Sequence, residues 1–157
     1  MEKKENLIKN LKNNCFCRLG QSKIHGVGVL ATKDIPKGVK IFQLCNGETD
    51  QDILDLEEED LRGLNEGTTD YIKSFMIKNE DGYPVPEKGL NSINISFFLN
   101  HSHTPNVIHE INLINNKTGY LIAVAAKDVR KGEELTEDYR TMAPKEYIES
   151  QFPFLGE

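Results

Sequence analysis

The chain has 157 residues, 38% of them hydrophobic, and a formal net charge of −6 at pH 7. This length suits one compact domain and is too short to divide plausibly into two. The excess of acidic residues argues against a broad basic surface that would bind DNA or RNA. If the protein has a macromolecular partner, electrostatics favours a basic one. No stretch approaches the ~20 consecutive apolar residues of a membrane span, and no signal-type segment follows Met1, so we expect a soluble, intracellular protein.

The first third of the chain predicts one helix followed by short strands. Leu7, Ile8 and Leu11 recur at helical spacing, so residues 3–13 are expected to form an amphipathic helix or a frayed tail. Beyond Cys15, short apolar runs separated by glycines and turns are typical of strands. These runs are CFCRL at 15–19, VGVLAT at 27–32 and VKIFQLC at 39–45.

The remaining elements alternate between helix and strand patterns. Residues 49–66 place isoleucine and leucine among many carboxylates, which predicts a helix with a solvated acidic face. Pro144 is expected at the first position of a last short helix. A turn is predicted at NEDG (79–82) and a hairpin loop at NNKTG (115–119). Strands are predicted at INISFFLN (93–100), VIHEINLI (107–114), YLIAVAAKD (120–128) and EELTEDY (133–139).

Two short segments repeat one pattern. ATKDIPKG at 31–38 and AAKDVRKG at 125–132 share Ala-x-Lys-Asp-apolar-x-Lys-Gly, and each follows an apolar run. The pattern predicts two similar turns, in which Gly38 and Gly132 adopt backbone conformations that a side chain would resist. Many short strands with few helices favour a mainly β domain.

The cysteines and histidines were considered as metal ligands. The three cysteines form no CxxC pair, so reduced thiols are expected and a disulfide framework or zinc knuckle has little support. His101 and His103, at i and i+2, could share one strand face, but the other candidate ligands stand at no recognised spacing. A hydrolase that uses Ser102 would lack the GxSxG elbow. The sequence therefore predicts no metal site.

Three polar segments carry the candidate site. In FFLNHSHTPN (97–106), Asn100 and His101 follow an apolar run and offer donors and acceptors for a heterocycle or an amino acid, although this segment taken alone is better explained as a capped strand end. In IHGVGVLA (24–31), the GxG lacks the third glycine of a dinucleotide turn, so it indicates close approach to a small ligand or an ordinary hairpin. Tyr139 ends KGEELTEDYR (131–140) and either orients an amine or packs at the surface.

Read together and in order, these three segments resemble the SET-domain protein-lysine methyltransferases over roughly residues 15–140. The resemblance implies a β-clip SET fold of small curved sheets with a pseudo-knot that joins the three segments. It implies S-adenosyl-L-methionine as methyl donor, no metal, and Tyr139 as the catalytic residue. The cofactor-binding positions that it implies are Gly26, Val27, Gly28, Asn100, His101, Tyr139 and Phe154.

The sequence also departs from this family. Cys45 stands where many members have a tyrosine, so an active-site hydroxyl is missing or comes from Tyr71 or Tyr83. Glu137 replaces an aromatic residue that limits methylation state, and His103 stands where larger members have a zinc-binding cysteine. The zinc-bound tail is absent, which leaves Phe152 and Phe154 either to close the site or to pack in the surface. The substrate-binding positions implied are Glu137, Cys45 and Phe98.

We therefore expect a minimal SET protein of viral or bacterial type, a monomer or homodimer, that methylates a lysine of a protein such as a histone. The alternative is a degenerate SET module that binds a peptide or partner without catalysis. We expect no direct contact with nucleic acid or membrane, and a cytoplasmic or nuclear location, including one inside a host cell. The expected organisation is a helix or tail at 1–14, the SET domain at 15–142 with a variable insert at 49–92, and a short helix and tail at 143–157.

Overall fold

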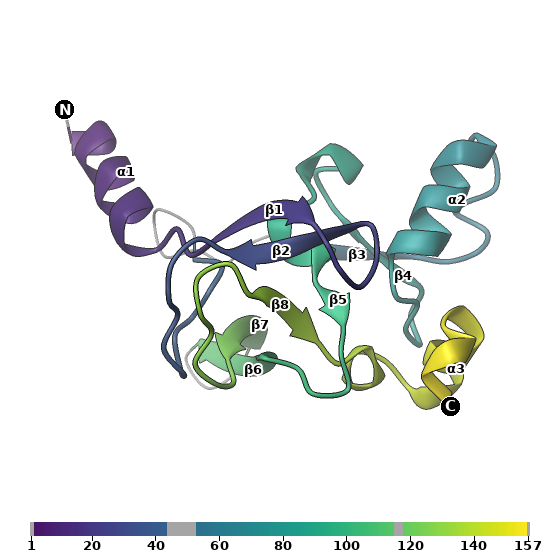
Figure 1. The fold of residues 1–157 in the computed structure, drawn as a ribbon. Coiled ribbons are helices and arrows are strands. Elements are labelled where there is room, and N and C mark those ends of the chain that lie inside the picture. The colour runs from purple at the N-terminus through teal and green to yellow at the C-terminus, as the bar shows by residue number, and fades with distance from the viewer. Residues whose placement is uncertain (1, 44–52, 115–117, 157) are drawn as a thin grey trace. The chain divides into compact units, whose positions relative to one another are not determined.

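The computed structural model describes residues 2–43, 53–114 and 118–156, and Figure 1 shows their backbone. The chain forms two compact units, one from Met1–Asp50 with Asn94–Asp138 and the other from Gln51–Ile93 with Tyr139–Glu157. Each unit is described by itself. Both consist of small sheets and short helices, which confirms the expected mainly β class.

A four-stranded sheet in the order β1-β2-β8-β5 is the main sheet of the first unit. Strands β1 (Cys17–Gln21), β2 (Val27–Ala31) and β8 (Glu134–Glu137) are antiparallel neighbours. Strand β5 (Asn100–His101) pairs in parallel with β8, so two segments that are far apart in sequence meet at one edge of the sheet (Figure 1). A separate two-stranded ladder, β6 and β7, consists of Val107–Ile114 and Thr118–Ala125.

The core of the first unit is built around β2 and β8. Val29 and Leu135 are register partners across these strands, and both are 0% exposed. Complete burial of such an aliphatic side chain stabilises a fold by roughly 1.5–3 kcal/mol. The same cluster contains Ala31, Ile35, Ile41, Leu99, Val107, Ala125 and Val129.

Helix α1 (Glu2–Asn13) leaves its apolar stripe in solvent, with Leu7 48% and Leu11 53% exposed. Its last carbonyls lack intrahelical partners, and the Nζ of Lys33 donates to two of them at 3.0 and 3.1 Å. A basic side chain from the loop after β2 therefore caps this helix.

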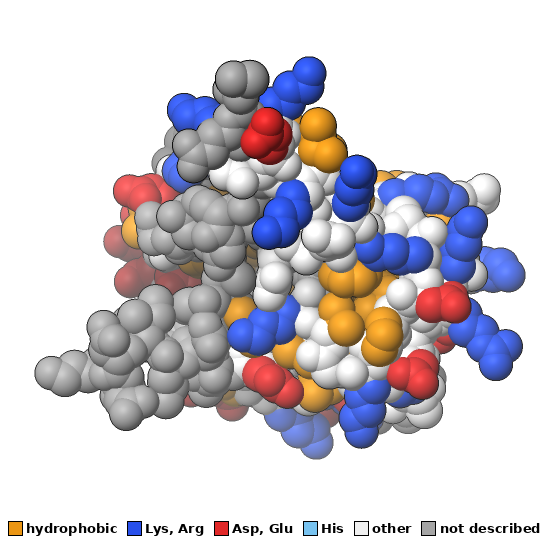
Figure 2. All heavy atoms as spheres, turned by 90° about the vertical axis from the view of Figure 1, so that its left-hand side faces the viewer, with side chains coloured by type: hydrophobic (Ala, Val, Ile, Leu, Met, Phe, Trp, Pro, Cys, Tyr) orange, Lys and Arg blue, Asp and Glu red, His pale blue; other side chains and the backbone are white. Residues whose placement is uncertain are grey.

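Figure 2 shows further Lys and Arg side chains spread over one face of the molecule, with small apolar patches between them.

The repeated pattern forms two turns that hydrogen-bond to each other. Ile35 and Val129 exchange backbone hydrogen bonds of 2.8 and 2.9 Å. The carboxylates of Asp34 and Asp128 each accept, at 2.8 Å, from a backbone N–H of the opposite turn. The final glycines have φ of 84° and 85°, a region that favours glycine, so the prediction of two similar turns is confirmed.

The second unit combines one small ladder with short helices (Figure 1). The amide of Gln151 on the last α-helix donates to Met76 O at 2.9 Å and accepts from Lys78 N at 2.6 Å, which ties that helix to the end of α2 (Glu66–Phe75). Ile72 and Ile148 are both 2% exposed. The elements are β3 (Ile53–Leu56), α2 (Glu66–Phe75), β4 (Tyr83–Pro86), η1 (Leu90–Ser92), η3 (Tyr139–Thr141), α3 (Lys145–Gln151) and η4 (Pro153–Gly156).

Several predicted elements are confirmed. The helix expected at 3–13 is α1, and the last short helix is α3, although Pro144 is its N-cap and not its first residue as expected. The predicted turn at 79–82 forms around Asn79, whose Oδ1 accepts from two backbone N–H groups. The strands expected at 15–19, 27–32, 107–114, 120–128 and 133–139 correspond to β1, β2, β6, β7 and β8. The loop residues 115–117 lie outside the described residues.

The helix predicted at 49–66 is wrong over the described residues 53–65. Ile53–Leu56 is instead a strand that pairs residue by residue with Tyr83–Pro86. The helix begins only at Glu66, because the Oδ1 of Asn65 accepts from the N–H of Thr68 at 2.9 Å and caps it there. The leucine spacing suited a helix, but pairing with a distant strand determined the structure.

Two predicted strands are also wrong. Residues 93–100 contain the 3-10 helix η2 (Ile95–Phe98), in which Asn94 accepts from the N–H of Ser96 at 2.8 Å, and only Asn100 at the end is in a strand. In the segment 39–45, the described residues 39–43 contain a single bridge, from Lys40 to Val124.

No helix among the described residues is long and apolar enough to cross a membrane.

Candidate functional site

The pairing of β5 with β8 brings Asn100 against the loop that precedes β2. Asn100 is 9% exposed, and its Nδ2 lies within hydrogen-bond distance of four acceptors. These are Ser22 Oγ at 3.1 Å, His25 O at 3.2 Å, Val27 O at 3.1 Å and Glu134 Oε1 at 2.9 Å. Because an amide nitrogen carries two hydrogens, it satisfies two of these acceptors at a time. Asn100 therefore anchors the residues that precede and begin β2 to the rest of the main sheet. This segment, residues 22–28, is called the 22–28 loop.

Ser22 and Glu134 complete this network. The Oγ of Ser22 donates to Glu134 Oε1 at 2.7 Å and accepts from the N–H groups of Ile24 at 2.8 Å and His25 at 3.1 Å. The other carboxylate oxygen, Glu134 Oε2, accepts from Lys23 N at 3.3 Å. Neither residue was predicted from the sequence. Glu134 belongs to the KGEELTEDYR segment (131–140), whereas Ser22 belongs to no motif that could have identified it.

The two glycines of the GxG segment have different physical roles. Gly26 has φ of 51°, and its carbonyl accepts from Ser22 N at 3.0 Å, which closes a tight turn. Nothing lies within 4 Å of a Cβ built on Gly26, and Val27 is 48% exposed, so this turn faces open space. A Cβ on Gly28 would lie 2.3 Å from Glu134 Oε1. The close approach that the structure shows at Gly28 is thus by a carboxylate of the protein.

His101 follows Asn100 on β5 and is held by its neighbours. Its Nδ1 lies 3.7 Å from Asp138 Oδ1, and its ring meets the edge of the His103 ring at a centroid distance of 4.6 Å. Phe98, an expected substrate-binding residue, is half-buried and packs against the core of the first unit. No group of three or more His, Cys, Asp or Glu among the described residues is arranged to hold a metal ion.

Glu137 lies at the end of β8 in a buried position, 8% exposed, and its Oε2 is 3.6 Å from Nδ1 of His109 on β6. Burial raises the pKa of Glu137 to about 8, because water no longer solvates its anion. Burial also lowers the pKa of His109. Both groups are therefore largely uncharged near neutral pH. The sequence reasoning selected Glu137 but gave no sign that His109 would be its neighbour.

This burial predicts a pH dependence of stability. A carboxyl whose pKa is raised on folding stabilises the folded state at low pH, and that stabilisation is lost as the pH rises toward about 8. His109 acts in the opposite direction, but only below its ordinary pKa of 6.5. We expect Glu137 to lower the free energy of unfolding by about 1 to 2 kcal/mol between pH 6.5 and 8.5.

Urea unfolding at several pH values in this range measures the effect. Glu137→Gln should remove this loss of stability, because an amide does not ionise, whereas Glu110→Gln at an exposed position of β6 should keep it. An equal pH slope in the unaltered chain and in Glu137→Gln would show that Glu137 is not the titrating group.

Tyr139 begins η3, in the second unit, directly after Asp138 in the chain. Its ring packs on Phe152 at a centroid distance of 5.2 Å. Because the two units are described separately, the expected meeting of Tyr139 with Asn100 stays a prediction. Cys45 and the side chain of Phe154 lie outside the described residues, so their expected roles also stay predictions.

The two tyrosines considered as replacements for the missing hydroxyl also belong to the second unit. Tyr83 is 6% exposed, and its hydroxyl donates to Glu58 Oε1 at 3.0 Å. Tyr71 is 38% exposed and packs against Phe75 at a ring centroid distance of 5.3 Å. The hydroxyl of Tyr83 is thus already used in a structural hydrogen bond.

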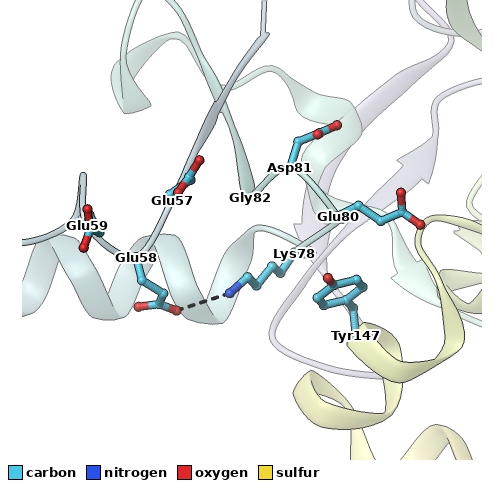
Figure 3. Close-up of a pocket in the computed structure, with 8 residues that line it drawn as sticks. All are labelled: Glu57, Glu58, Glu59, Lys78, Glu80, Asp81, Gly82 and Tyr147. Atoms are coloured by element: carbon cyan, nitrogen blue, oxygen red, sulfur yellow. Dashed lines mark ion pairs between the residues drawn. The ribbon is translucent and has the colours of Figure 1, made fainter.

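A hollow of about 400 Å³ in the second unit is lined mostly by carboxylates (Figure 3). Glu58 is paired with Lys73 at 2.6 Å and with Lys78 at 3.5 Å. The hydrogen bond from Lys73, followed by that from Tyr83, lowers the pKa of Glu58. This carboxylate is therefore part of a structural ion-pair network. The lining residues are Glu57, Glu58, Glu59, Lys78, Glu80, Asp81, Gly82 and Tyr147.

Comparison with known proteins adds family evidence. The sequence model of the SET domain matches residues 26–140. The chain is 29% identical over 129 residues to the Homo sapiens protein named "Histone-lysine N-methyltransferase 2D", over 82% of this chain and 2% of that protein. It is 33% identical over 122 residues to a Schizosaccharomyces pombe protein named "Histone-lysine N-methyltransferase, H3 lysine-4 specific", over 77% of this chain and 12% of that protein. The chain thus spans a small part of these curated relatives.

Two solved structures resemble the fold. One is a Plasmodium falciparum protein described as a histone methyltransferase, with a TM-score of 0.51 and 20% identity, covering 80% of this chain and 94% of that one. The other is a humanized mutant of the Chaetomium thermophilum Polycomb Repressive Complex 2, with a TM-score of 0.56 and 22% identity. That alignment covers 84% of this chain and 16% of the other. At these identities the likeness concerns the fold alone.

Proposed function

Because the chain belongs to the SET-domain family, we propose that it transfers a methyl group from S-adenosyl-L-methionine to a lysine side chain of a protein substrate. The family match over residues 26–140 carries this proposal, since it includes the GxG loop, Asn100 and Tyr139. Relatives named histone-lysine N-methyltransferases support a histone as the substrate class. A histone substrate would place the activity in a nucleus, of its own cell or of a host.

The loop at 22–28 has features that suit this cofactor. The turn at Gly26 faces open space and Val27 is 48% exposed, so a ligand can approach the outer side of this turn. Asn100 contacts this loop, and His101 pairs with Glu137 at the end of β8; their amide and imidazole groups suit an adenine or a carboxylate. We propose that these residues hold S-adenosyl-L-methionine, which supplies an electrophilic methyl group on a sulfonium.

The protein must also prepare its lysine. A lysine amine is a nucleophile only when neutral, and its ordinary pKa near ~10.4 keeps it charged at neutral pH. We propose that Tyr139 orients the amine through its hydroxyl and that Glu137 and Phe98 contribute to the substrate side of the site, which excludes water from the amine. Fixing such a geometry accounts for several kcal/mol of a reaction barrier in general.

The charge distribution supports a basic substrate. The second unit contains six Lys and Arg but fourteen Asp and Glu, a net charge of −8. The first unit has thirteen basic and eleven acidic residues, a net charge of +2. A lysine-rich peptide such as a histone tail would therefore be attracted to the second unit, and this attraction would weaken as salt is added.

Incubation of the full chain with radiolabelled S-adenosyl-L-methionine and histones tests the proposal. We expect label in a histone, and a peptide that spans the target should lose the label when its lysine is replaced by arginine. Cofactor binding without any labelled product would favour the alternative, a SET module that binds without turnover. A folded chain that binds no S-adenosyl-L-methionine and labels no protein would contradict the proposed function.

A further inference from the structure

The carboxylate of Glu134, at the start of β8, is the point to which the loop before β2 is fastened. We propose that Glu134 is a positioning residue that holds the 22–28 loop and the amide of Asn100 in their ligand-binding arrangement. This inference rests on the proposed function, because the ligand meant is S-adenosyl-L-methionine. Glu134 itself would act through the loop and would not touch the reacting atoms.

Both carboxylate oxygens of Glu134 accept hydrogen bonds from this loop, and Oε1 also accepts from Asn100 on β5. Oε1 accepts from Ser22 Oγ at 2.7 Å and from Asn100 Nδ2 at 2.9 Å, and Oε2 accepts from Lys23 N at 3.3 Å. Hydrogen bonds to an ionised acceptor are stronger than those between neutral groups. Ser22 Oγ, which donates to this carboxylate, in turn accepts hydrogen bonds from the N–H groups of Ile24 and His25. A single side chain thus orients several groups immediately before the GxG turn.

The absence of a side chain at Gly28 leaves room for the carboxylate of Glu134. A Cβ at position 28 would lie 2.3 Å from Glu134 Oε1, 2.9 Å from its Cδ and 3.1 Å from Ser22 Cβ. Any side chain at position 28 would therefore move the carboxylate out of its hydrogen-bonded place. The second glycine of GxG and Glu134 form one spatial unit, although 106 positions separate them in the sequence.

The side chain of Glu134 makes polar contacts and is not part of the hydrophobic core. Glu134 is half-buried, and its side chain hydrogen-bonds to the loop and to Asn100, whereas its neighbour Leu135 is 0% exposed and packs with Val29. Loss of the carboxylate should therefore loosen the loop and leave the core packed. This difference allows a positioning role to be distinguished from a general structural one.

Kinetics of Glu134→Ala test the inference. We expect the KM for S-adenosyl-L-methionine to rise about tenfold or more, with kcat at saturating cofactor changed less than about threefold. Glu134→Gln, which keeps one acceptor oxygen, should lie between Glu134→Ala and the unaltered chain. Glu133→Gln is the matched control, because it removes the same charge from the adjacent exposed position and should leave the cofactor KM unchanged.

A double-mutant cycle tests the pairing with Gly28. Gly28→Ala alone should raise the cofactor KM to a similar extent, because its methyl group displaces the carboxylate. In a Glu134→Ala background the same substitution should add little, because the atom that it would meet at 2.3 Å is gone. Fully additive effects of the two substitutions would overturn the proposed pairing.

Amide hydrogen exchange supplies a readout that does not depend on activity. The N–H groups of Ile24 and His25, which bond to Ser22 Oγ, should exchange faster in Glu134→Ala while the N–H groups of β2 stay protected. Unchanged loop exchange with an unchanged cofactor KM would overturn the inference about Glu134 alone. If the unaltered chain binds no S-adenosyl-L-methionine, the proposed function fails, and the positioning role toward that cofactor fails with it.

Discussion

Replacement of Tyr139 by phenylalanine is expected to lower kcat for methyl transfer at least about 100-fold and to leave cofactor affinity within about threefold. The change removes one hydroxyl and keeps the ring, which packs on Phe152 at 5.2 Å, so the fold should persist. The proposed hydroxyl contact to the lysine amine would be lost. Single-turnover transfer and titration of the cofactor measure the two quantities separately.

Tyr147→Phe is the matched control for this prediction. Tyr147 also belongs to the second unit, on α3, and it lines the acidic hollow (Figure 3). Its replacement should leave kcat unchanged within about twofold, since no step of the proposed reaction uses its hydroxyl. Full activity in Tyr139→Phe would remove Tyr139 from the catalytic role, and equal losses in both variants would point to general damage to the unit.

Leu135→Ala is expected to lower the free energy of unfolding by about 3 kcal/mol. Leu135 is 0% exposed on β8 and faces Val29 on β2, so truncation leaves a cavity between two central strands of the main sheet. Its neighbour Glu134 anchors the 22–28 loop, so this substitution should also weaken cofactor binding. Urea unfolding monitored by circular dichroism gives the change in stability.

Leu19→Ala provides the comparison within the same sheet. Leu19 lies on β1 and is 42% exposed, so its truncation removes little buried surface and should lower the free energy of unfolding by less than about 1 kcal/mol. Similar losses in the two variants would mean that the core is not centred on β2 and β8.

The sequence predicted most strands and the two similar turns because their signals are local. Apolar runs bounded by glycine identified β2 and β7, and the repeated pattern ending in Gly38 and Gly132 identified two turns with positive φ. It also identified Asn100 as a polar residue after an apolar run. The structure shows what that residue does: its side-chain amide hydrogen-bonds to the 22–28 loop.

The wrong predictions have two physical causes. The apolar residues between positions 53 and 64 were compatible with a helix, but the pairing of residues 53–56 with residues 83–86 made that segment a strand. Asn94 and Asn65 directed the chain into helical turns at places that the apolar pattern did not reveal. Long-range pairing and single side-chain caps therefore decided between alternatives that local hydrophobicity left equal.

By itself, the sequence determined the family, because GxG, Asn-His and Tyr139 appear in an order that is typical of it; these are also the segments proposed to form the site. Only the tertiary structure decided how those segments are held. The bond from Ser22 to Glu134 spans 112 positions, and the proximity of His109 to Glu137 depends on the packing of β6 against β8. Such contacts depend on strand pairing and burial in three dimensions, which no local residue pattern encodes.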